Sequence, residues 1–349
     1  MNTRTISKRL ALIPTCLALG WMSAALAAPK VYVANETDGT VSVIATDTRQ
    51  TVRTIAVGAG AHNVQASADG QRVWVTNNGT PPADAGHGGH QGMSGAGHAA
   101  MTTPGEVWAI NTATDTVVGK VPVGNHPAHV VVSADGRWVY VTNGGDNTVS
   151  VVDAGAPKVV TTIATDAFPH GIRLSPDGQQ AYVANLKGGT VSVIDTASRK
   201  AVASIPVGQG PAQVGFTDDG RLAFVSLSQE DRVAVIDPKT RAVLRKVPVG
   251  DGPIQLFATP DGQRLLVANQ GSRKNPGRTV SVIDLTSFKV TASIRTGRGA
   301  HGVVVDADGR HAYVSNLYDN TVTVIDLVSH KPVATVPVGA GPNGISVTP

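Results

Sequence analysis

Residues 139–153 read VYVTNGGDNTVSVVD, and this stretch decides the fold. Two short runs of alternating β-branched and small residues flank a Gly-containing turn, which is the pattern of a β-hairpin. The same pattern recurs seven times along the chain, each time with an anchor residue at the end of the first run. The anchors are Asn35, Asn77, Asn143, Asn185, Ser226, Asn269 and Asn316.

Two further strand patterns separate each hairpin from the next. The first ends in Val-Pro-Val-Gly, as at 247–250, and the second closes in Asp-Gly, as at 177–178. The anchors are 42, 66, 42, 41, 43 and 47 residues apart. A period just above 40 that holds four short strands is typical of propeller blades. We therefore predict an all-β protein whose residues 28–349 form one seven-bladed β-propeller of four-stranded antiparallel blades.

The two ends of the repeat region are out of phase with a blade. Residues 31–35 match the second strand of a blade, and residues 343–348 match a first strand. Pairing the C-terminal strand with the three N-terminal strands would complete the seventh blade and remove the open strand edges. The sequence therefore predicts a ring closed by one strand from the C-terminus.

The repeat resembles that of the YVTN-repeat β-propellers. Residues 140–143 spell the motif that names this family, and residues 175–178 and 190–195 match the rest of its consensus. The resemblance covers residues 31–349 and implies the fold. It implies no single activity, because similar repeats occur in surface-layer proteins, in exported proteins of unknown role and in the cofactor-binding propellers of haem d1 nitrite reductases.

Residues 1–27 have the features of a signal peptide. Arg4, Lys8 and Arg9 precede an apolar run, and residues 25–27 are Ala-Leu-Ala, a small-x-small cleavage signal. We predict cleavage after Ala27 and a periplasmic or secreted protein. Losing those three cations takes the net charge from +4 to +1, and it removes Cys16, the only cysteine. The mature chain would then have no thiolate ligand for a metal.

The first strand of every blade opens with an imidazole or an amide side chain. Since first strands lie nearest the axis, we predict that these side chains converge on the mouth of the central channel. They would form a polar pocket for an anionic or metal-bearing ligand. The alternative is that they only satisfy backbone groups in the connections between blades. The seven residues are His62, His129, His170, Gln213, Gln255, His301 and Asn343.

The second repeat carries a long insertion, residues 78–105, in a loop that has 4 to 9 residues in the other repeats. It is rich in Gly and Ala and places imidazoles beside thioethers, ligands that together suit copper. Loops of this length are usually functional or disordered, so an incidental insertion is the alternative. The candidate copper ligands are His87, His90, Met93, His98 and Met101.

These features favour an exported, non-enzymatic binding protein whose partner is a metal ion such as copper, a small ligand or another exported protein. The alternative is a propeller lyase or lactonase, a class with a similar shape, in which His62, His170 or His301 acts as general base. No Glu or Asp stands among the first-strand openings to hold a hard divalent metal. Binding of single-stranded nucleic acid is a third hypothesis, disfavoured by the near-neutral mature chain and by 4% aromatic residues.

The Asp residues that end the third strands should form turns. These are Asp153, Asp195, Asp237, Asp284 and Asp326.

Overall fold

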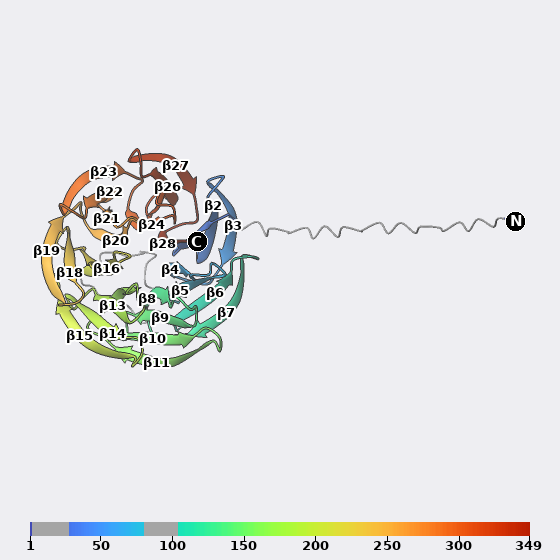
Figure 1. The fold of residues 1–349 in the computed structure, drawn as a ribbon, viewed down its shortest axis with the longest axis horizontal. Helices are drawn as coiled ribbons and strands as arrows, with labels where there is room; N and C mark the ends of the chain where they lie inside the picture. The colour runs from blue at the N-terminus through green and yellow to red at the C-terminus, as the bar shows by residue number, and fades with distance from the viewer. Residues whose placement is uncertain (2–27, 80–103) are drawn as a thin grey trace.

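The computed structural model describes residue 1 and residues 28–79 and 104–349. These residues form 28 strands in seven four-stranded antiparallel sheets, which stand around a common axis as the blades of a propeller (Figure 1). The predicted seven-bladed fold is confirmed. The described ranges contain no helix, and so none that could cross a membrane.

We number the blades from the N-terminus and call the strands of each blade A to D from the axis outwards. Blade 1 comprises β28 (Pro342–Val347), β1 (Lys30–Asn35), β2 (Thr40–Ala45) and β3 (Gln50–Ala56). Blade 2 comprises β4 (Ala61–Ala66), β5 (Arg72–Asn77), β6 (Glu106–Asn111) and β7 (Thr116–Pro122). Blade 3 comprises β8 (Pro127–Val132), β9 (Trp138–Asn143), β10 (Thr148–Asp153) and β11 (Lys158–Ala164).

The other four blades follow in chain order. Blade 4 comprises β12 (Pro169–Leu174), β13 (Gln180–Asn185), β14 (Thr190–Asp195) and β15 (Lys200–Pro206). Blade 5 comprises β16 (Pro211–Phe216), β17 (Ala223–Leu227), β18 (Arg232–Asp237) and β19 (Ala242–Pro248). Blade 6 comprises β20 (Pro253–Ala258), β21 (Arg264–Gly271), β22 (Pro276–Asp284) and β23 (Lys289–Arg295). Blade 7 comprises β24 (Ala300–Val305), β25 (His311–Asn316), β26 (Thr321–Asp326) and β27 (Lys331–Pro337).

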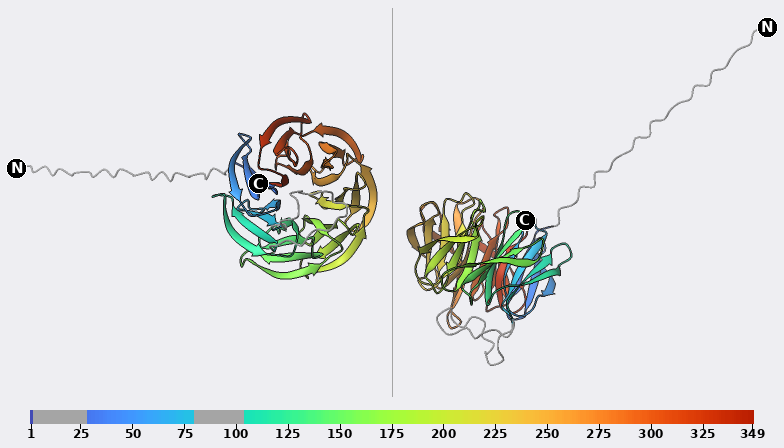
Figure 2. Two further views of the ribbon diagram at one scale, coloured as in Figure 1. Left: turned by 180° about the vertical axis from the view of Figure 1, so that it is seen from behind. Right: turned by 90° about the horizontal axis from the view of Figure 1, so that it is seen from below.

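The hydrophobic core lies between the blades, because each sheet packs a face on each neighbour. Strands B and C are therefore buried on both faces, whereas the outermost strands are mostly exposed, as a comparison of β13 with β15 shows. Between blades 3 and 4, for example, Val131 and Tyr140 pack with Ile172 and Ile194. The blades surround the axis as a disk, and the C-terminus lies on one face of it (Figure 2).

The ring closes as predicted. β28 pairs with β1 in antiparallel register, with Ile345 opposite Val33 and Val347 opposite Val31. Beyond the strand, the backbone amide of Lys30 donates to the hydroxyl of Thr348 over 2.9 Å. One strand from the C-terminus thus completes the blade formed by the first three strands.

The anchor asparagines fasten strand B to strand C. Asn143 donates from Nδ2 to the hydroxyls of Thr148 (3.0 Å) and Ser150 (2.9 Å). Asn35, Asn185, Asn269 and Asn316 make the equivalent pair of bonds.

Two blades depart from the anchor pattern. In blade 5 the assignment of Ser226 as the anchor is wrong by one residue: Leu227 pairs with Pro211 as Asn185 pairs with Pro169. In blade 2 the Thr and Ser are replaced by Glu106 and Trp108, and the buried amide of Asn77 has no hydrogen-bond partner within the described part of the chain.

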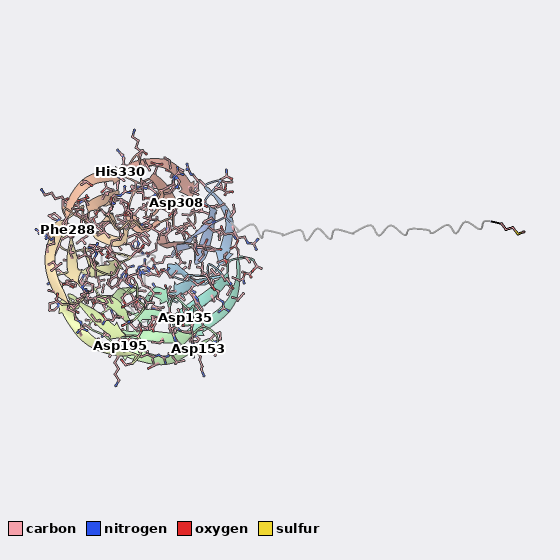
Figure 3. All side chains as sticks on the ribbon, in the orientation of Figure 1. Asp135, Asp153, Asp195, Phe288, Asp308 and His330 are labelled. Atoms are coloured by element: carbon pink, nitrogen blue, oxygen red, sulfur yellow. The ribbon has the colours of Figure 1, made fainter. Side chains whose placement is uncertain are left out.

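The Asp residues that end strand C form turns, as expected. Oδ1 of Asp195 accepts from the backbone amide of Ser198 (2.7 Å), and Oδ1 of Asp153 accepts from that of Gly155 (2.9 Å). Asp237, Asp284 and Asp326 make similar bonds. Figure 3 labels Asp153 and Asp195 near the rim of the disk, away from the axis.

A β-bulge lies at the start of strand A in every blade. In blade 4, Pro169 pairs with Asn185 and Ile172 with Val183, so His170 and Gly171 together face Ala184. A bulge releases its residues from the regular alternation of a strand and can redirect a side chain. The seven bulges coincide with the seven polar openings identified in the sequence. We call this side of the disk, where the B–C loops and D–A connections lie, the mouth face.

Candidate metal centre

All seven opening side chains are buried, although every one is polar. Their exposed fractions lie between 0 and 3% for His62, His129, His170, Gln213, Gln255, His301 and Asn343. Buried polar groups need partners, and several of these side chains are partners of one another.

Three of the imidazoles meet. The ring centroids of His129 and His170 are 4.7 Å apart, and those of His62 lie 5.4 Å from His170 and 5.9 Å from His129. One potential ligand atom from each ring lies within 4.8 Å of the other two. An ion about 2.0–2.1 Å from each nitrogen would need these atoms about 3.4 Å apart, so small side-chain rotations would close the site. We call His62, His129 and His170 the three-His cluster.

The threonine of the repeat motif aligns the bulges of neighbouring blades. The hydroxyl of Thr142 accepts from the backbone amide of His129 (2.9 Å) and donates to the carbonyl of His170 (2.7 Å). Thr76 likewise accepts from the amide of Asn63 (3.1 Å) and donates to the carbonyl of Ala128 (2.7 Å). The positions of the clustered histidines are therefore tied together through strand B.

Gly171 allows the same close approach between blades 4 and 5. A Cβ at this position would collide with the carbonyl oxygen of Ala212 and with the side chain of Gln213. The residue after His170 must therefore be glycine if the two bulges are to touch. This explains the His-Gly order of the opening pair in blade 4.

The tautomer of His170 is fixed by the next blade. Its Nδ1 lies 2.9 Å from the carbonyl oxygen of Ala212, which can only accept a hydrogen bond. Nδ1 therefore carries the proton, and in the neutral ring the lone pair is on Nε2. A backbone carbonyl on the second ring nitrogen is the usual partner of a metal-binding histidine.

His129 is held in its neutral form. Burial lowers its pKa well below the ordinary 6.5, and the neighbouring His170, His62, Arg173 and His301 lower it further. Its Nδ1 accepts a hydrogen bond from Nε2 of Gln213 over 3.1 Å, because the amide oxygen of Gln213 accepts from the backbone amide of Val214. In the neutral ring the proton is therefore on the buried Nε2, which has no hydrogen-bond partner among the described residues. A neutral imidazole is the form that binds a metal, but binding through Nε2 requires the ring proton to move to Nδ1 and the amide of Gln213 to turn its oxygen toward that atom.

Glu36 joins the cluster and was missed in the sequence, where only the openings of strand A were compared. Its Oε1 lies 3.5 Å from Nδ1 of His62, and its Oε2 accepts from Nδ2 of Asn343 over 2.9 Å. That Nδ2 atom is also 3.2 Å from Nδ1 of His62. Glu36 directly follows the anchor Asn35. A comparison of the residues that follow the anchors could therefore have identified it from the sequence.

The remaining sequence candidates divide into two groups. Gln213 and Asn343 contact the cluster from blades 5 and 1, and His301 is close enough to influence the pKa of His129. Gln255 is buried in the same ring, and its Nε2 has no hydrogen-bond partner in residues 28–79 and 104–349. The candidate copper ligands lie outside the described residues, and so does the proposed signal peptide. The copper candidates are His87, His90, Met93, His98 and Met101.

Comparison with known proteins relates the chain to other propellers. Residues 100–264, less than half of the chain, match the family model described as "Cytochrome D1 heme domain". No match was found among curated protein sequences.

Three solved structures share the fold. A hydrazine synthase of Kuenenia stuttgartiensis is 23% identical (TM-score 0.69), with 82% of this chain and 89% of that one covered. The periplasmic gluconolactonase PpgL of Pseudomonas aeruginosa is 20% identical (TM-score 0.70; 92% and 99% covered). The dihydro-haem d1 dehydrogenase NirN in complex with DHE is 16% identical (TM-score 0.62; 90% and 74% covered). Identities this low show the fold alone.

The described residues do not fit a haem at the three-His cluster. A macrocycle needs a flat slot beside one axial imidazole, whereas three rings here are packed against one another at 4.7–5.9 Å and are buried. One ligand atom of each ring lies within 4.8 Å of the other two. Such a donor set suits a single ion.

Proposed function

We propose that this protein is an exported β-propeller that binds one transition-metal ion at the three-His cluster on its mouth face. The observation that carries the proposal is the convergence of three buried imidazoles from blades 2, 3 and 4, with ligand atoms within 4.8 Å of one another. Among the described residues, the buried Nε2 of His129 has no hydrogen-bond partner. An ion would occupy this position once the ring proton has moved to Nδ1.

Copper is the metal that the donor set favours, with zinc as its main competitor. Neutral imidazole suits both ions, and a given site of nitrogen and oxygen ligands binds Cu²⁺ more tightly than the other divalent first-row metals. Glu36 beside His62 supplies the carboxylate partner that commonly orients a metal-binding histidine. The signal-peptide features of residues 1–27 support a periplasmic or secreted location.

A second candidate function is metal-assisted hydrolysis of a small ester or lactone. Three protein ligands leave one position of a tetrahedral ion open, as in catalytic zinc sites. The relevant observation is that His301 is buried near the cluster yet is not one of its three members. In this hypothesis His301 is the general base. The fold likeness to the gluconolactonase makes lactones the first substrates to assay.

Metal titration of the mature protein tests the proposal. Protein freed of metal with a chelator should take up about one equivalent of Cu²⁺ or Zn²⁺ at the cluster. His129→Gln should weaken this binding more than about 100-fold, since loss of even an outer partner of a ligand costs about 10–100-fold. His330→Asn is the matched control, because Figure 3 labels His330 near the rim and the substitution also removes one imidazole.

The second candidate is tested separately. If the protein hydrolyses lactones, His301→Gln should abolish turnover and leave the metal stoichiometry unchanged. Metal binding without turnover of any lactone or ester would support the binding protein and reject the hydrolase.

A further inference from the structure

A single charged residue occupies the inner strands at a position where the other blades are neutral. Arg173 lies on β12, opposite Tyr182 of β13. The equivalent residues of the other six blades carry no charge. They are Gln65, Val131, Gly215, Phe257, Val304 and Ser346.

The guanidinium of Arg173 bonds to a residue two blades away. Its Nη1 donates to Oε1 of Gln65 over 2.6 Å, and Gln65 belongs to blade 2 whereas Arg173 belongs to blade 4. Blade 3 stands between these two blades in the ring, so the bond crosses the inner side of blade 3. The same two blades also meet at His62 and His170, three residues earlier on each strand, a distance of at most about 10 Å.

Arg173 makes no ion pair with any carboxylate of the described residues. Burial among protein atoms lowers its pKa to about 10, which still leaves it fully charged at neutral pH. Its exposure is nevertheless intermediate. Both facts fit a side chain that is enclosed by the inner strands but still has part of its surface exposed to solvent.

Among the described residues, Gln65 is the one hydrogen-bond partner of this guanidinium, so most of its donors have no partner there. A guanidinium has five N–H donors in a planar fork, and this arrangement matches the two oxygens of a carboxylate or a phosphate. Enclosing such a charge is costly unless an anion accompanies it. Gln65 is neutral, so it supplies an acceptor and no compensating charge.

From this placement we infer that the axial channel binds a small oxyanion, either a carboxylate or an inorganic phosphate, on the guanidinium of Arg173 next to the three-His cluster. The inference does not depend on the metal, because the residues that carry it are Arg173 and Gln65. It adds a ligand class to the protein: a small anion seated on the axis between blades 2 and 4.

The mature protein, kept free of metal, provides the test. Acetate and phosphate would be titrated separately by calorimetry at fixed ionic strength in chloride, and the rise in melting temperature with each anion would be recorded. One of the two should bind with about 1:1 stoichiometry, and the arm that binds identifies the carboxylate or the phosphate as the preferred source.

Three variants decide whether Arg173 is the site. Arg173→Gln should weaken binding at least tenfold. Gln65→Glu should do the same with Arg173 intact, because it places a carboxylate where the 2.6 Å bond now stands and so fills the site from within. Arg72→Gln is the control: this arginine bonds the carbonyl of Ala154 at a site away from the inner strands, and its loss should leave anion binding unchanged.

The inference is overturned if neither anion binds the wild-type protein above the chloride background. It is equally overturned if Arg173→Gln and Gln65→Glu bind as tightly as Arg72→Gln. If Arg173→Gln does not fold, Gln65→Glu alone decides, since it adds an ion pair and removes none.

Discussion

The Nδ1 atom of His170 lies 2.9 Å from the carbonyl oxygen of Ala212, and the two residues belong to neighbouring blades. The protonation state of a candidate ligand is therefore set by blade packing. Any change that moves blade 5 away from blade 4 should disturb the ring of His170 as well as the stability of the disk. The proposed metal site and the fold can thus be tested by the same substitutions.

Gly171→Ala should weaken both metal binding at the three-His cluster and the stability of the fold. The added Cβ overlaps Ala212 and Gln213, so the bulges of blades 4 and 5 must separate, at a cost of about 1–3 kcal/mol. Denaturant unfolding would measure this loss, and metal titration should show weaker binding. The control is Gly119→Ala, whose Cβ would meet only Ala109 at 3.8 Å. Equal stability of the two variants would show that the close approach at Gly171 is dispensable.

Thr142→Val should lower the free energy of unfolding by about 1–3 kcal/mol, since it leaves the buried amide of His129 and the carbonyl of His170 without their hydroxyl partner. Thr142→Ser keeps the hydroxyl and should recover most of the loss. Urea unfolding of the valine and serine variants would compare their free energies of unfolding. A serine variant as unstable as the valine variant would assign the effect to packing.

Stability should fall with pH below 6.5 because of His129. Above its ordinary pKa of 6.5 the imidazole is neutral in both folded and unfolded chains. Between 6.5 and its lowered folded pKa, only the unfolded chain binds the proton, so the free energy of unfolding decreases by up to about 1.4 kcal/mol per pH unit. His129→Gln should flatten this slope in urea unfolding at several pH values. An unchanged slope would mean that His129 is not held neutral.

Removal of residues 342–349, which contain β28, should destabilise the whole ring. The truncation leaves blade 1 with three strands and exposes the inner edge of β1, and it removes the buried Ile345. Loss of one buried Ile side chain already costs about 2–5 kcal/mol, so the total should exceed that range. Thermal unfolding of the truncated and full-length proteins provides the measurement. Similar melting temperatures would refute closure by the C-terminal strand.

The insertion at 78–105 remains a separate copper hypothesis. A variant with His87, His90 and His98 changed to Ala should lose a labile second equivalent of copper, while the three-His cluster keeps its own. Titration with Cu(I) and Cu(II) distinguishes the two sites. If this variant takes up as much copper as the wild type, the insertion does not bind copper.

The fold could be predicted because most blades need the same residue types at the same positions. Asn143, its hydroxyl partners and the Asp turns recur at fixed spacing, so their pattern is visible in one sequence. Where a blade departs from the repeat, the prediction was less accurate: Ser226 was aligned one residue early because blade 5 has no anchor amide.

The site was predicted only in part. The ring of opening residues was visible because it recurs, but which of its members meet depends on how the bulges turn the side chains. Glu36 and Arg173 were missed for the same reason, since each occurs once and neither stands at an opening. A non-repeated residue on a repeated scaffold carries no periodic signal, so only its spatial neighbours reveal it.

X-ray absorption of the protein loaded with one equivalent of copper or zinc tests the central claim most directly. The scattering from imidazole rings around the ion should indicate three imidazole ligands. Each single substitution should remove one of these ligands: His62→Gln, His129→Gln or His170→Gln. An imidazole count that stays the same when all three histidines are replaced would contradict a metal centre at the three-His cluster.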